Sequence, residues 1–384
     1  MEETIRVLLI DDSLSDGLIV RQLLTADSSV SAALTAVHSL FDGIHRLKAG
    51  GIDAVLLDLS LPDSSGLATL ARFQASCPEI PVLILTGSEN EELAIESVHG
   101  GAQDYLVKWR FQPQSLVRAL RYAIERQKRR HLEACIRSTN VELRAAREIQ
   151  QRLCPASVPV LRGYELAGAW HPAQATCGDY YDFIRMGTRF LAIAIGDVCG
   201  HGLGPALLMA ETRACLRTLA TTDMDVAEIL TKINQLLTED LAGERFVTLL
   251  LARLDLQSRD LVYAGAGHQG HLLEASGHFA LLDSTSQPLG LDRDLVVACG
   301  VERRLQEGEL LLMVTDGVHE ALSPDGEMFG MERVLRLIGD HCSEPAQTIV
   351  DHLHAAVQVF SAGAPQADDF TAVVLKVVDV AAAP

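Results

Sequence analysis

The sequence lacks the features of several common protein classes. None of its eight cysteines forms a Cys-x-x-Cys pair, which argues against a zinc ribbon or a disulfide framework and favours a reducing cytoplasm. The longest apolar runs, such as 54–57 and 310–314, are far too short to cross a bilayer, and the N-terminus shows no signal-peptide pattern. We therefore expect a cytoplasmic protein with no membrane segment.

Basic charge is also scarce. The net charge is −19 at pH 7, and the only basic run spans residues 126–130. A nucleic-acid surface needs a basic face, and no helix-turn-helix candidate follows this run, so we do not expect DNA binding. The hydrophobic fraction of 48% over 384 residues is ample for two or three folded domains.

Glycine and proline are absent from residues 114–154. This absence predicts one long helix, or two in line, that joins two dissimilar segments. Alternating steps of four and three, the spacing of a coiled-coil seam, separate Leu132, Ile136, Thr139, Leu143, Ala146, Gln150 and Leu153. We interpret residues 126–154 as a helical coiled-coil linker through which the chain forms a homodimer. A simple spacer, or a helix packed on its own domain, is the alternative.

Short apolar runs alternate with helix-length stretches over the first 125 residues. The runs span residues 7–10, 54–57, 82–85 and 105–107. This alternation predicts that residues 1–125 form a doubly wound α/β domain, in which helices cover both faces of a parallel sheet. Ligands of such sheets bind beyond the carboxyl ends of the strands.

Polar side chains gather at those strand ends, namely Asp11, Asp12, Asp58, Thr86 and Lys108. Three carboxylates at one edge would repel each other unless a hard cation neutralises them, and oxygen ligands of this kind suit Mg²⁺. Taken singly, an Asp after a strand is often only a helix cap, and a strand-end Lys is often only a surface charge. The ordered set is therefore the signal.

This whole segment resembles the receiver domain of two-component response regulators. The resemblance implies a flavodoxin-like fold in which Asp58 accepts a phosphoryl group from a sensor histidine kinase or a phosphotransfer protein. The Mg²⁺ ligands it implies are Asp11, Asp12, Asp58 and the carbonyl of Ser60. The residues it assigns to the phosphate or to the switch are Lys108, Thr86 and Tyr105. Metal and ammonium would screen the charge that develops when a carboxylate attacks phosphorus.

Beyond Pro155, short apolar runs are separated by glycine-rich turns. Candidate strands span residues 191–195, 247–254, 261–264, 310–314 and 370–377, and candidate helices span 205–219 and 226–237. This pattern predicts that residues 155–384 form an α+β domain, with an antiparallel sheet sandwich flanked by helices.

Acids recur beside glycines at the strand ends of this segment, at Asp179, Asp197, Asp316, Asp368 and Asp369. Carboxylates that meet in one cleft suit a pair of hard divalent cations, which activate water and neutralise a phosphoryl group. Flanking glycines let the backbone approach such a site closely. Any single Asp-Gly is more often a simple turn, but four acid sites together indicate a metal centre.

These motifs resemble the PPM-type (type 2C) metal-dependent serine/threonine phosphatases, in particular the SpoIIE/RsbU-like branch. The matching stretches are 146–151, 266–268, 288–291, 315–321 and 368–371. The resemblance implies an αββα sandwich with two Mn²⁺ or Mg²⁺ ions bridged by Asp197. The other ligands it implies are Asp179, the Val198 carbonyl, Asp316 and Asp368, with Asp369 nearby.

Two departures from this branch leave the implied ligands in place. Cys199 stands where the branch usually has Ser, and residues 185–187 make an unusually short turn. Direct ligand roles for His201, His268 and His319 are disfavoured, because hard oxygen ligands dominate such sites.

The two resemblances together imply a response regulator whose output is a protein phosphatase gated by Asp58. The implied substrate is a phosphorylated STAS-type anti-sigma-factor antagonist. The alternative is a pseudophosphatase that only sequesters its partner. Because such a domain is expected to lose at least one of Asp197, Asp316 and Asp368, and all three are present, the enzyme is favoured.

Overall fold

The computed structural model describes residues 4–26, 31–87, 96–108, 110–155, 157–241, 245–364 and 366–379. Its contacts divide the chain into two units, residues 1–139 and 140–384. Helix α5 (Pro113–Leu153) crosses this division, which therefore falls inside the predicted linker. Among the described residues, no helix is both long and apolar enough to cross a membrane.

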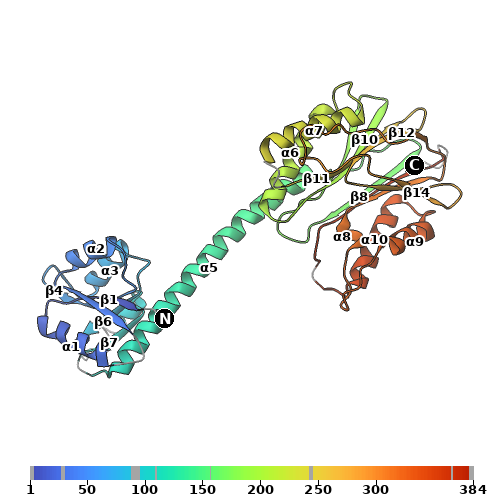
Figure 1. Ribbon diagram of the computed structural model, residues 1–384. Coiled ribbons are helices and arrows are strands. Elements are labelled where there is room, and N and C mark those ends of the chain that lie inside the picture. Colours follow the sequence, from blue (N-terminus) through green and yellow to red (C-terminus); the bar gives the residue numbers. More distant parts are fainter. Residues whose placement is uncertain are drawn as a thin grey trace. The chain divides into compact units, whose positions relative to one another are not determined.

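The first unit contains a parallel sheet in the order β2-β1-β3-β6-β7, with helices on both faces (Figure 1). Its sheet strands are β1 (Ile5–Ile10), β2 (Ala32–Val37), β3 (Ala54–Asp58), β6 (Val82–Thr86) and β7 (Asp104–Val107). The remaining elements are α1 (Leu14–Ala26), α2 (Leu40–Lys48), β4 (Ser60–Leu61), β5 (Ser64–Ser65) and α3 (Leu67–Ser76). This order confirms the doubly wound, flavodoxin-like fold class.

Two cores hold this unit together, one on each face of the sheet. Every residue of β3 and β6 is buried, as expected for central parallel strands covered on both sides. Leu70 and Phe73 of α3 pack on one face, and Leu116 and Leu120 at the start of α5 pack on the other. Because the strands between these two cores are parallel, their carboxyl ends all lie at one edge of the sheet.

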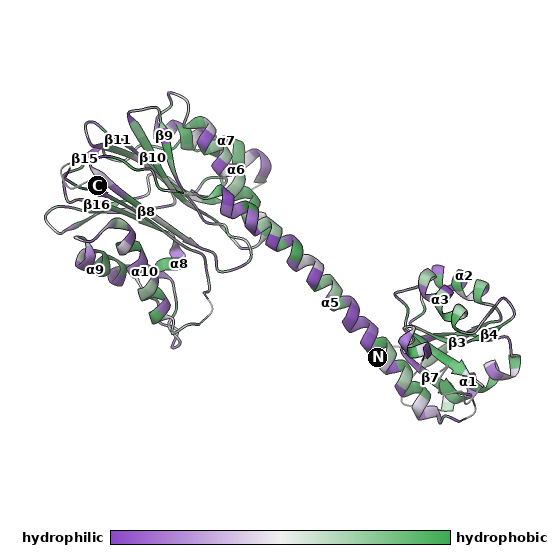
Figure 2. Ribbon diagram, turned by 180° about the vertical axis from the view of Figure 1, so that it is seen from behind, coloured by the Kyte–Doolittle hydropathy of each residue, from purple (hydrophilic) through white to green (hydrophobic). Residues whose placement is uncertain are grey.

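Helix α5 begins with Pro113 and is continuous to Leu153, so the predicted stretch forms one helix and not two in line. Its middle is largely hydrophilic (Figure 2). Leu132 and Ile136 of the predicted seam are 60% and 52% exposed, whereas Gln150 is only 4% exposed. The predicted seam residues thus differ in solvent exposure: Leu132 and Ile136 are exposed, whereas Gln150 is buried in the second unit.

The second unit is built from two five-stranded antiparallel sheets, in the orders β15-β12-β11-β10-β9 and β14-β13-β16-β17-β8. The first sheet contains β9 (Tyr180–Met186), β10 (Phe190–Val198), β11 (Val247–Asp255), β12 (Asp260–Ala266) and β15 (Arg303–Arg304). The second contains β8 (Tyr164–His171), β13 (Gly270–Leu273), β14 (Phe279–Leu282), β16 (Leu310–Val314) and β17 (Phe370–Val377). The helices are α6 (Leu203–Leu219), α7 (Val226–Leu241), α8 (Asp316–His319), α9 (Met331–His341) and α10 (Ala346–Phe360).

These elements stack in four layers (Figure 1). Side chains such as Ile193, Leu250 and Val373 fill the space between the sheets. One sheet carries α6 and α7 on its outer face, and the other carries α9 and α10. The arrangement confirms the predicted αββα sandwich, and it brings the ends of strands from both sheets to one edge of the unit.

Candidate functional sites

The first site lies at the carboxyl edge of the parallel sheet. Asp11 follows β1, Asp58 ends β3 and Lys108 follows β7, so the fold brings together residues that are far apart in the sequence. Carboxylate oxygens of Asp11, Asp12 and Asp58 lie within 4.8 Å of one another. This is the spacing that a shared cation requires, and the three acids are among the magnesium ligands predicted from the sequence.

Lys108 supplies a positive charge to this cluster. Its Nζ lies 2.8 Å from Asp11 Oδ2 and 2.7 Å from Asp16 Oδ2, and it also contacts Asp58. Although burial opposes the ammonium charge, the three carboxylates raise the pKa of Lys108 above its ordinary value. Burial is the main reason that the pKa of Asp11 is also raised. The site is therefore partly neutralised from within.

Asp16 is a member of this site that the sequence analysis did not identify. It lies in the first turn of α1 and is 8% exposed. The signal was its position, since a helical acid four or five residues after the acidic pair returns to the same edge of the sheet. Its pairing with Lys108, 92 residues away, depends on the tertiary fold.

The remaining receiver candidates surround the same edge. Thr86 is 8% exposed at the end of β6, and its carbonyl accepts a hydrogen bond from the Lys108 amide at 2.8 Å. Ser60 donates its amide to Asp58 Oδ1 at 2.9 Å. Tyr105 is half-buried in β7 and packs beside the core formed by α2 and α3.

The second site is formed where the two antiparallel sheets end together. Asp197 lies in β10, and Asp179 directly precedes β9; the pairing of Gly196 with Tyr180 sets them side by side. In the other sheet, Asp316 follows β16 and Asp368 lies just before β17. Four strand ends from two sheets thus present four carboxylates to one region.

Two glycines permit this close approach. A Cβ atom on Gly178 would lie 2.8 Å from the Val198 carbonyl oxygen and 3.4 Å from Asp197 Oδ1. A Cβ atom on Gly317 would overlap the carbonyl of Asp369. Larger residues at either position would force these backbone segments apart, and Val198 presents its carbonyl to the same region as the Asp197 carboxylate.

Asp179 is the most deeply buried of the four acids, with 1% exposure. The hydroxyls of Thr315 and Thr371 donate to its Oδ2 at 2.7 and 2.6 Å. Burial, and then the nearby charge of Asp197, raise the pKa of Asp179 well above its ordinary value. The two threonines leave the other oxygen of Asp179 available to a further partner.

Asp197 and Asp316 are also hard to ionise. Burial first, and then the charges of Asp316 and Asp368, raise the pKa of Asp197 to about 7. Burial, followed by Asp368, raises the pKa of Asp316. Within the described ranges, no Lys or Arg forms an ion pair with any of these four acids. A donor set of clustered oxygens without an internal cation fits hard divalent ions.

Asp369 and Asp182 have different surroundings from these four. Asp369 accepts hydrogen bonds from the backbone amides of Ala173 and Gly178 at 2.8 and 3.1 Å, which ties the loop before β9 to β17. Asp182 is fully buried and forms a two-point pair with Arg217 of α6, at 2.6 and 2.7 Å. Neighbouring acids in the sequence therefore serve different structural purposes.

A cavity of about 380 Å³ opens beside Asp197 and Asp316. Its other lining residues are Thr248, Gly267, His268, Gln269, His271, Val314, His319 and Met331. The Nδ1 atom of His268 lies 3.2 Å from the hydroxyl of Thr248, and burial lowers the pKa of His268 to about 4. A neutral imidazole thus lies beside the acids. The sequence analysis gave His268 and His319 no role, and their place in the cavity wall depends on the fold.

Cys199, one of the two departures, has a structural contact. Its sulfur accepts the Phe246 amide at 3.1 Å, and its own amide donates to the Phe246 carbonyl at the same distance. The thiol thus holds the turn after Asp197, as a serine hydroxyl does when it accepts a backbone hydrogen bond.

The end of α5 also reaches this site. Gln150 donates to the Cys177 carbonyl at 2.8 Å and accepts the Cys177 amide at 3.1 Å. Cys177 lies two residues before Asp179. A predicted seam residue therefore fixes the backbone that carries one of the acids.

Comparisons with known proteins match a separate family to each unit. Residues 7–121 match the family described as response regulator receiver domain, and residues 188–378 match the family described as Stage II sporulation protein E (SpoIIE). Protein IcfG of Synechocystis sp. is 28% identical over 57% of this chain and 40% of its own length. Phosphoserine phosphatase RsbU of Bacillus subtilis is 25% identical over 66% of this chain and 76% of its own length.

A solved structure supports the fold of the second unit. The SiaA-PP2C domain of Pseudomonas aeruginosa is 24% identical, with a TM-score of 0.56, over 63% of this chain and 98% of that domain. The chain therefore spans less than half of IcfG, about three quarters of RsbU and nearly all of the SiaA domain.

Proposed function

We propose that this chain removes phosphate from phosphoserine or phosphothreonine on a partner protein. Its residues 7–121 belong to the receiver family, and its residues 188–378 belong to the SpoIIE family. The observation that carries this proposal is the convergence of Asp179, Asp197, Asp316 and Asp368 from two sheets beside one cavity. The name of RsbU as a phosphoserine phosphatase supports the same reaction.

The same acids would hold two Mn²⁺ or Mg²⁺ ions. Asp197 and the Val198 carbonyl, which both lie against Gly178, would be two of the ligands, and Asp179, Asp316 and Asp368 would complete the oxygen donors. Bound ions would supply an activated water and neutralise the phosphoryl charge during in-line displacement. The chain's own contribution is to hold the carboxylates together. We assign Asp369 to positioning, because two backbone amides already occupy its carboxylate.

We further propose that phosphorylation of Asp58 gates this reaction. A sensor histidine kinase or phosphotransfer protein would be the donor, with Mg²⁺ held by Asp11, Asp12, Asp58 and the Ser60 carbonyl. Lys108 already contacts the Asp58 carboxylate, so it is placed to meet phosphate oxygens. Thr86 and Tyr105 would form the switch, as the sequence predicts.

Helix α5 would carry the signal between the units. The exposed Leu132 and Ile136 are suited to pairing with a second copy of the helix. Gln150 forms hydrogen bonds with the backbone of Cys177, two residues before Asp179. The proposed substrate is a phosphorylated STAS-type anti-sigma-factor antagonist. Its support is the resemblance to the SpoIIE/RsbU branch.

Hydrolysis of p-nitrophenyl phosphate with Mn²⁺ tests the catalytic site. We expect Asp197→Ala and Asp316→Ala to lower kcat/KM by about 10³-fold or more, because a two-metal site supplies several kcal/mol of transition-state stabilisation. Asp325→Asn, which removes an exposed acid from a turn, is the matched control and should retain wild-type activity. Unchanged rates in both Ala variants would refute the site assignment. A wild-type protein that binds its partner but never hydrolyses phosphate would support the pseudophosphatase.

Gating is tested by adding beryllofluoride, a phosphoryl mimic, to wild type and Asp58→Ala. We expect the rate to change in wild type only. A second test inserts residues near Lys128: four residues shift the seam by about half a heptad, whereas seven preserve its phase. Rate and dimerisation should change with the four-residue insertion and remain close to wild type with the seven-residue control. Indifference to both insertions would show that α5 is only a tether.

A further inference from the structure

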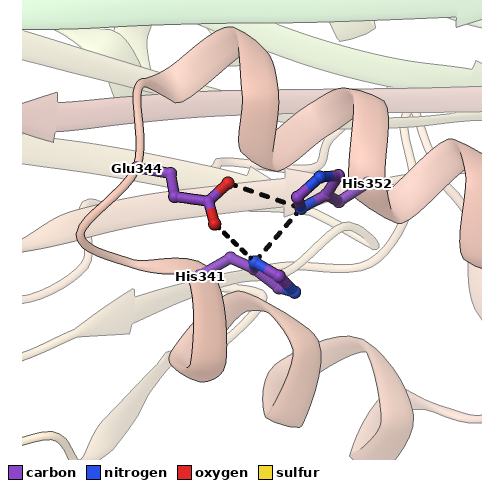
Figure 3. Close-up of side chains that lie close together, drawn as sticks. All are labelled: His341, Glu344 and His352. Carbon is purple, nitrogen blue, oxygen red and sulfur yellow. Dashed lines mark hydrogen bonds and ion pairs between the residues drawn. The ribbon is translucent and has the colours of Figure 1, made fainter.

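Three side chains outside the acidic sites converge where α9 passes into α10 (Figure 3). His341 ends α9, Glu344 lies in the connecting turn, and His352 lies on α10. His341 Nδ1 is 2.9 Å from Glu344 Oε1, and His352 Nδ1 is 3.1 Å from His341 Nδ1 and 3.4 Å from Glu344 Oε2. All three point inward, toward one another (Figure 3).

These separations are similar to the distances between neighbouring ligand atoms around a tetrahedral metal ion. Zinc binds imidazole nitrogen and carboxylate oxygen at about 2.0–2.2 Å, so two ligand atoms at a tetrahedral angle are roughly 3.3 Å apart. The observed distances of 2.9, 3.1 and 3.4 Å bracket this value. The 2.9 and 3.4 Å distances reach different oxygens of Glu344, so the two imidazole nitrogens and the Glu344 carboxylate together outline one face of such a site.

No arrangement of hydrogens on the two imidazole rings satisfies all the contacts among the three groups. If both Nδ1 atoms carry hydrogens, two N–H groups oppose each other 3.1 Å apart. If one carries a lone pair, an oxygen of Glu344 is left without a donor. Glu344 Oε2 is in fact buried and accepts no hydrogen bond from the described residues. A cation would resolve this conflict, because it accepts a lone pair from each group.

We propose that His341, Glu344 and His352 bind one Zn²⁺ ion at a site separate from the phosphatase metals. Two imidazoles and one carboxylate suit zinc, whereas the all-oxygen acidic sites suit Mg²⁺ or Mn²⁺. Lys376 is held by the Glu344 carbonyl at 2.9 Å, so its ammonium binds the backbone and leaves the carboxylate to the metal.

The bound ion would fasten α9 to α10. Helix α10 packs on β8 and β17, and β17 begins two residues after Asp368. Zinc at this position therefore braces the outer helical layer behind one wall of the acidic site. It shares no ligand with that site, so its binding can be measured independently of phosphatase activity.

The test is zinc binding by the full chain after metal removal. A chromophoric zinc chelator competes for the ion in millimolar Mg²⁺, which occupies the all-oxygen sites. We expect one zinc per chain in wild type. His341→Gln and His352→Gln should each weaken binding by about 100-fold or more, since even loss of an outer-shell partner costs 10–100-fold. Added zinc should raise the Tm of wild type but not of these variants.

Two controls separate this site from other binding. His354→Gln alters the same helix, but the ring of His354 stacks on His171 instead, so zinc affinity should be unchanged. Asp197→Ala and Asp316→Ala should also keep the zinc ion. Three results would overturn the proposal: no zinc retained by wild type after desalting, wild-type affinity in both His variants, or loss of zinc in the Asp variants alone. Circular dichroism verifies that each variant is folded.

Discussion

The two acidic sites of this chain obtain their counter-charge in different ways. In the receiver unit, the Lys108 ammonium contacts Asp11, Asp16 and Asp58. In the second unit, none of the described Lys or Arg residues pairs with the four clustered acids, and the nearby His268 is kept neutral by burial. One site carries its own cation, and the metal centre proposed for the other would take its cations from solution.

Because of this difference, the two acidic clusters should affect the stability of the metal-free protein differently. The receiver acids are partly neutralised before any metal binds, so their site contributes less strain to the folded unit. Burial first, and then the charges of neighbouring acids, raise the pKa values of Asp179, Asp197 and Asp316, so the ionised forms of these acids destabilise the metal-free fold. We therefore expect the proposed metal affinity of the second site to come at the expense of metal-free stability, a common trade at functional sites.

Removing the internal cation should have the largest effect. Lys108→Met leaves three contacting carboxylates without their shared partner, and the Lys108 side chain is only 11% exposed. We expect the free energy of unfolding of the receiver unit to fall by about 3–5 kcal/mol, the usual loss when a buried ion pair loses one member. Chemical denaturation of the full chain with chelator measures this loss.

Mg²⁺ should restore part of that stability, because the ion can replace the missing positive charge. The matched control is Lys232→Met, which removes a Lys whose Nζ hydrogen-bonds to Gln235 within α7. Its stability should stay within about 0.5 kcal/mol of wild type. Equal stability of Lys108→Met and wild type in chelator would show that Lys108 does not neutralise the cluster.

In the second unit, we expect removal of a charge to raise the metal-free free energy of unfolding instead of lowering it. Asp197→Asn removes one of four mutually repelling charges, so the metal-free free energy of unfolding should rise by about 1–2 kcal/mol near pH 8. With saturating Mn²⁺ the order should reverse, because only wild type keeps its full set of ligands. Denaturation curves with chelator and with Mn²⁺ measure both effects.

Asp182→Asn is the matched comparison for that variant. It also removes a buried acid, but this acid is paired with Arg217, so stability should fall by about 2–3 kcal/mol with or without Mn²⁺. If Asp197→Asn were as destabilising as Asp182→Asn in chelator, the proposed repulsion among the phosphatase acids would be absent.

Much of the fold could be predicted from the sequence because central strands are nearly continuous apolar runs. The predicted strands match β1, β3, β6 and the edge strand β7 of the first sheet, and β10, β11, β12, β16 and β17 of the sandwich. Six strands of the three large sheets were not predicted: β2, β8, β9, β14 and β15 lie at sheet edges, and β13 lies inside its sheet. Edge strands are half solvated, so their apolar pattern is weak.

The candidate sites divide in a similar way. Acids beside glycines at strand ends were visible in the sequence, because that placement is local. Contacts between distant segments were not: Asp16 with Lys108, Asp182 with Arg217, and Gln150 with Cys177. Gln150 shows why, since its heptad spacing is equally compatible with a coiled-coil seam and with docking on its own domain.

The smallest expected effect concerns the neutral imidazole beside the phosphatase acids. Burial lowers the pKa of His268 from its ordinary 6.5 to about 4, so the folded protein resists a proton that the unfolded chain accepts. Stability is therefore lost as the pH falls from about 6.5 toward about 4, by at most about 1.4 kcal/mol per pH unit. His268→Asn, which does not titrate, should lose about 1 kcal/mol less than wild type between pH 7 and 5.5.

Denaturation of the metal-free chain at each pH measures this difference, with His278→Asn as the control at an exposed position. The control should follow the wild-type curve. A His268→Asn curve parallel to wild type would mean that His268 takes up a proton in the folded state. It would then act as an internal cation for the acids nearby, and the two sites would no longer differ in the origin of their counter-charge.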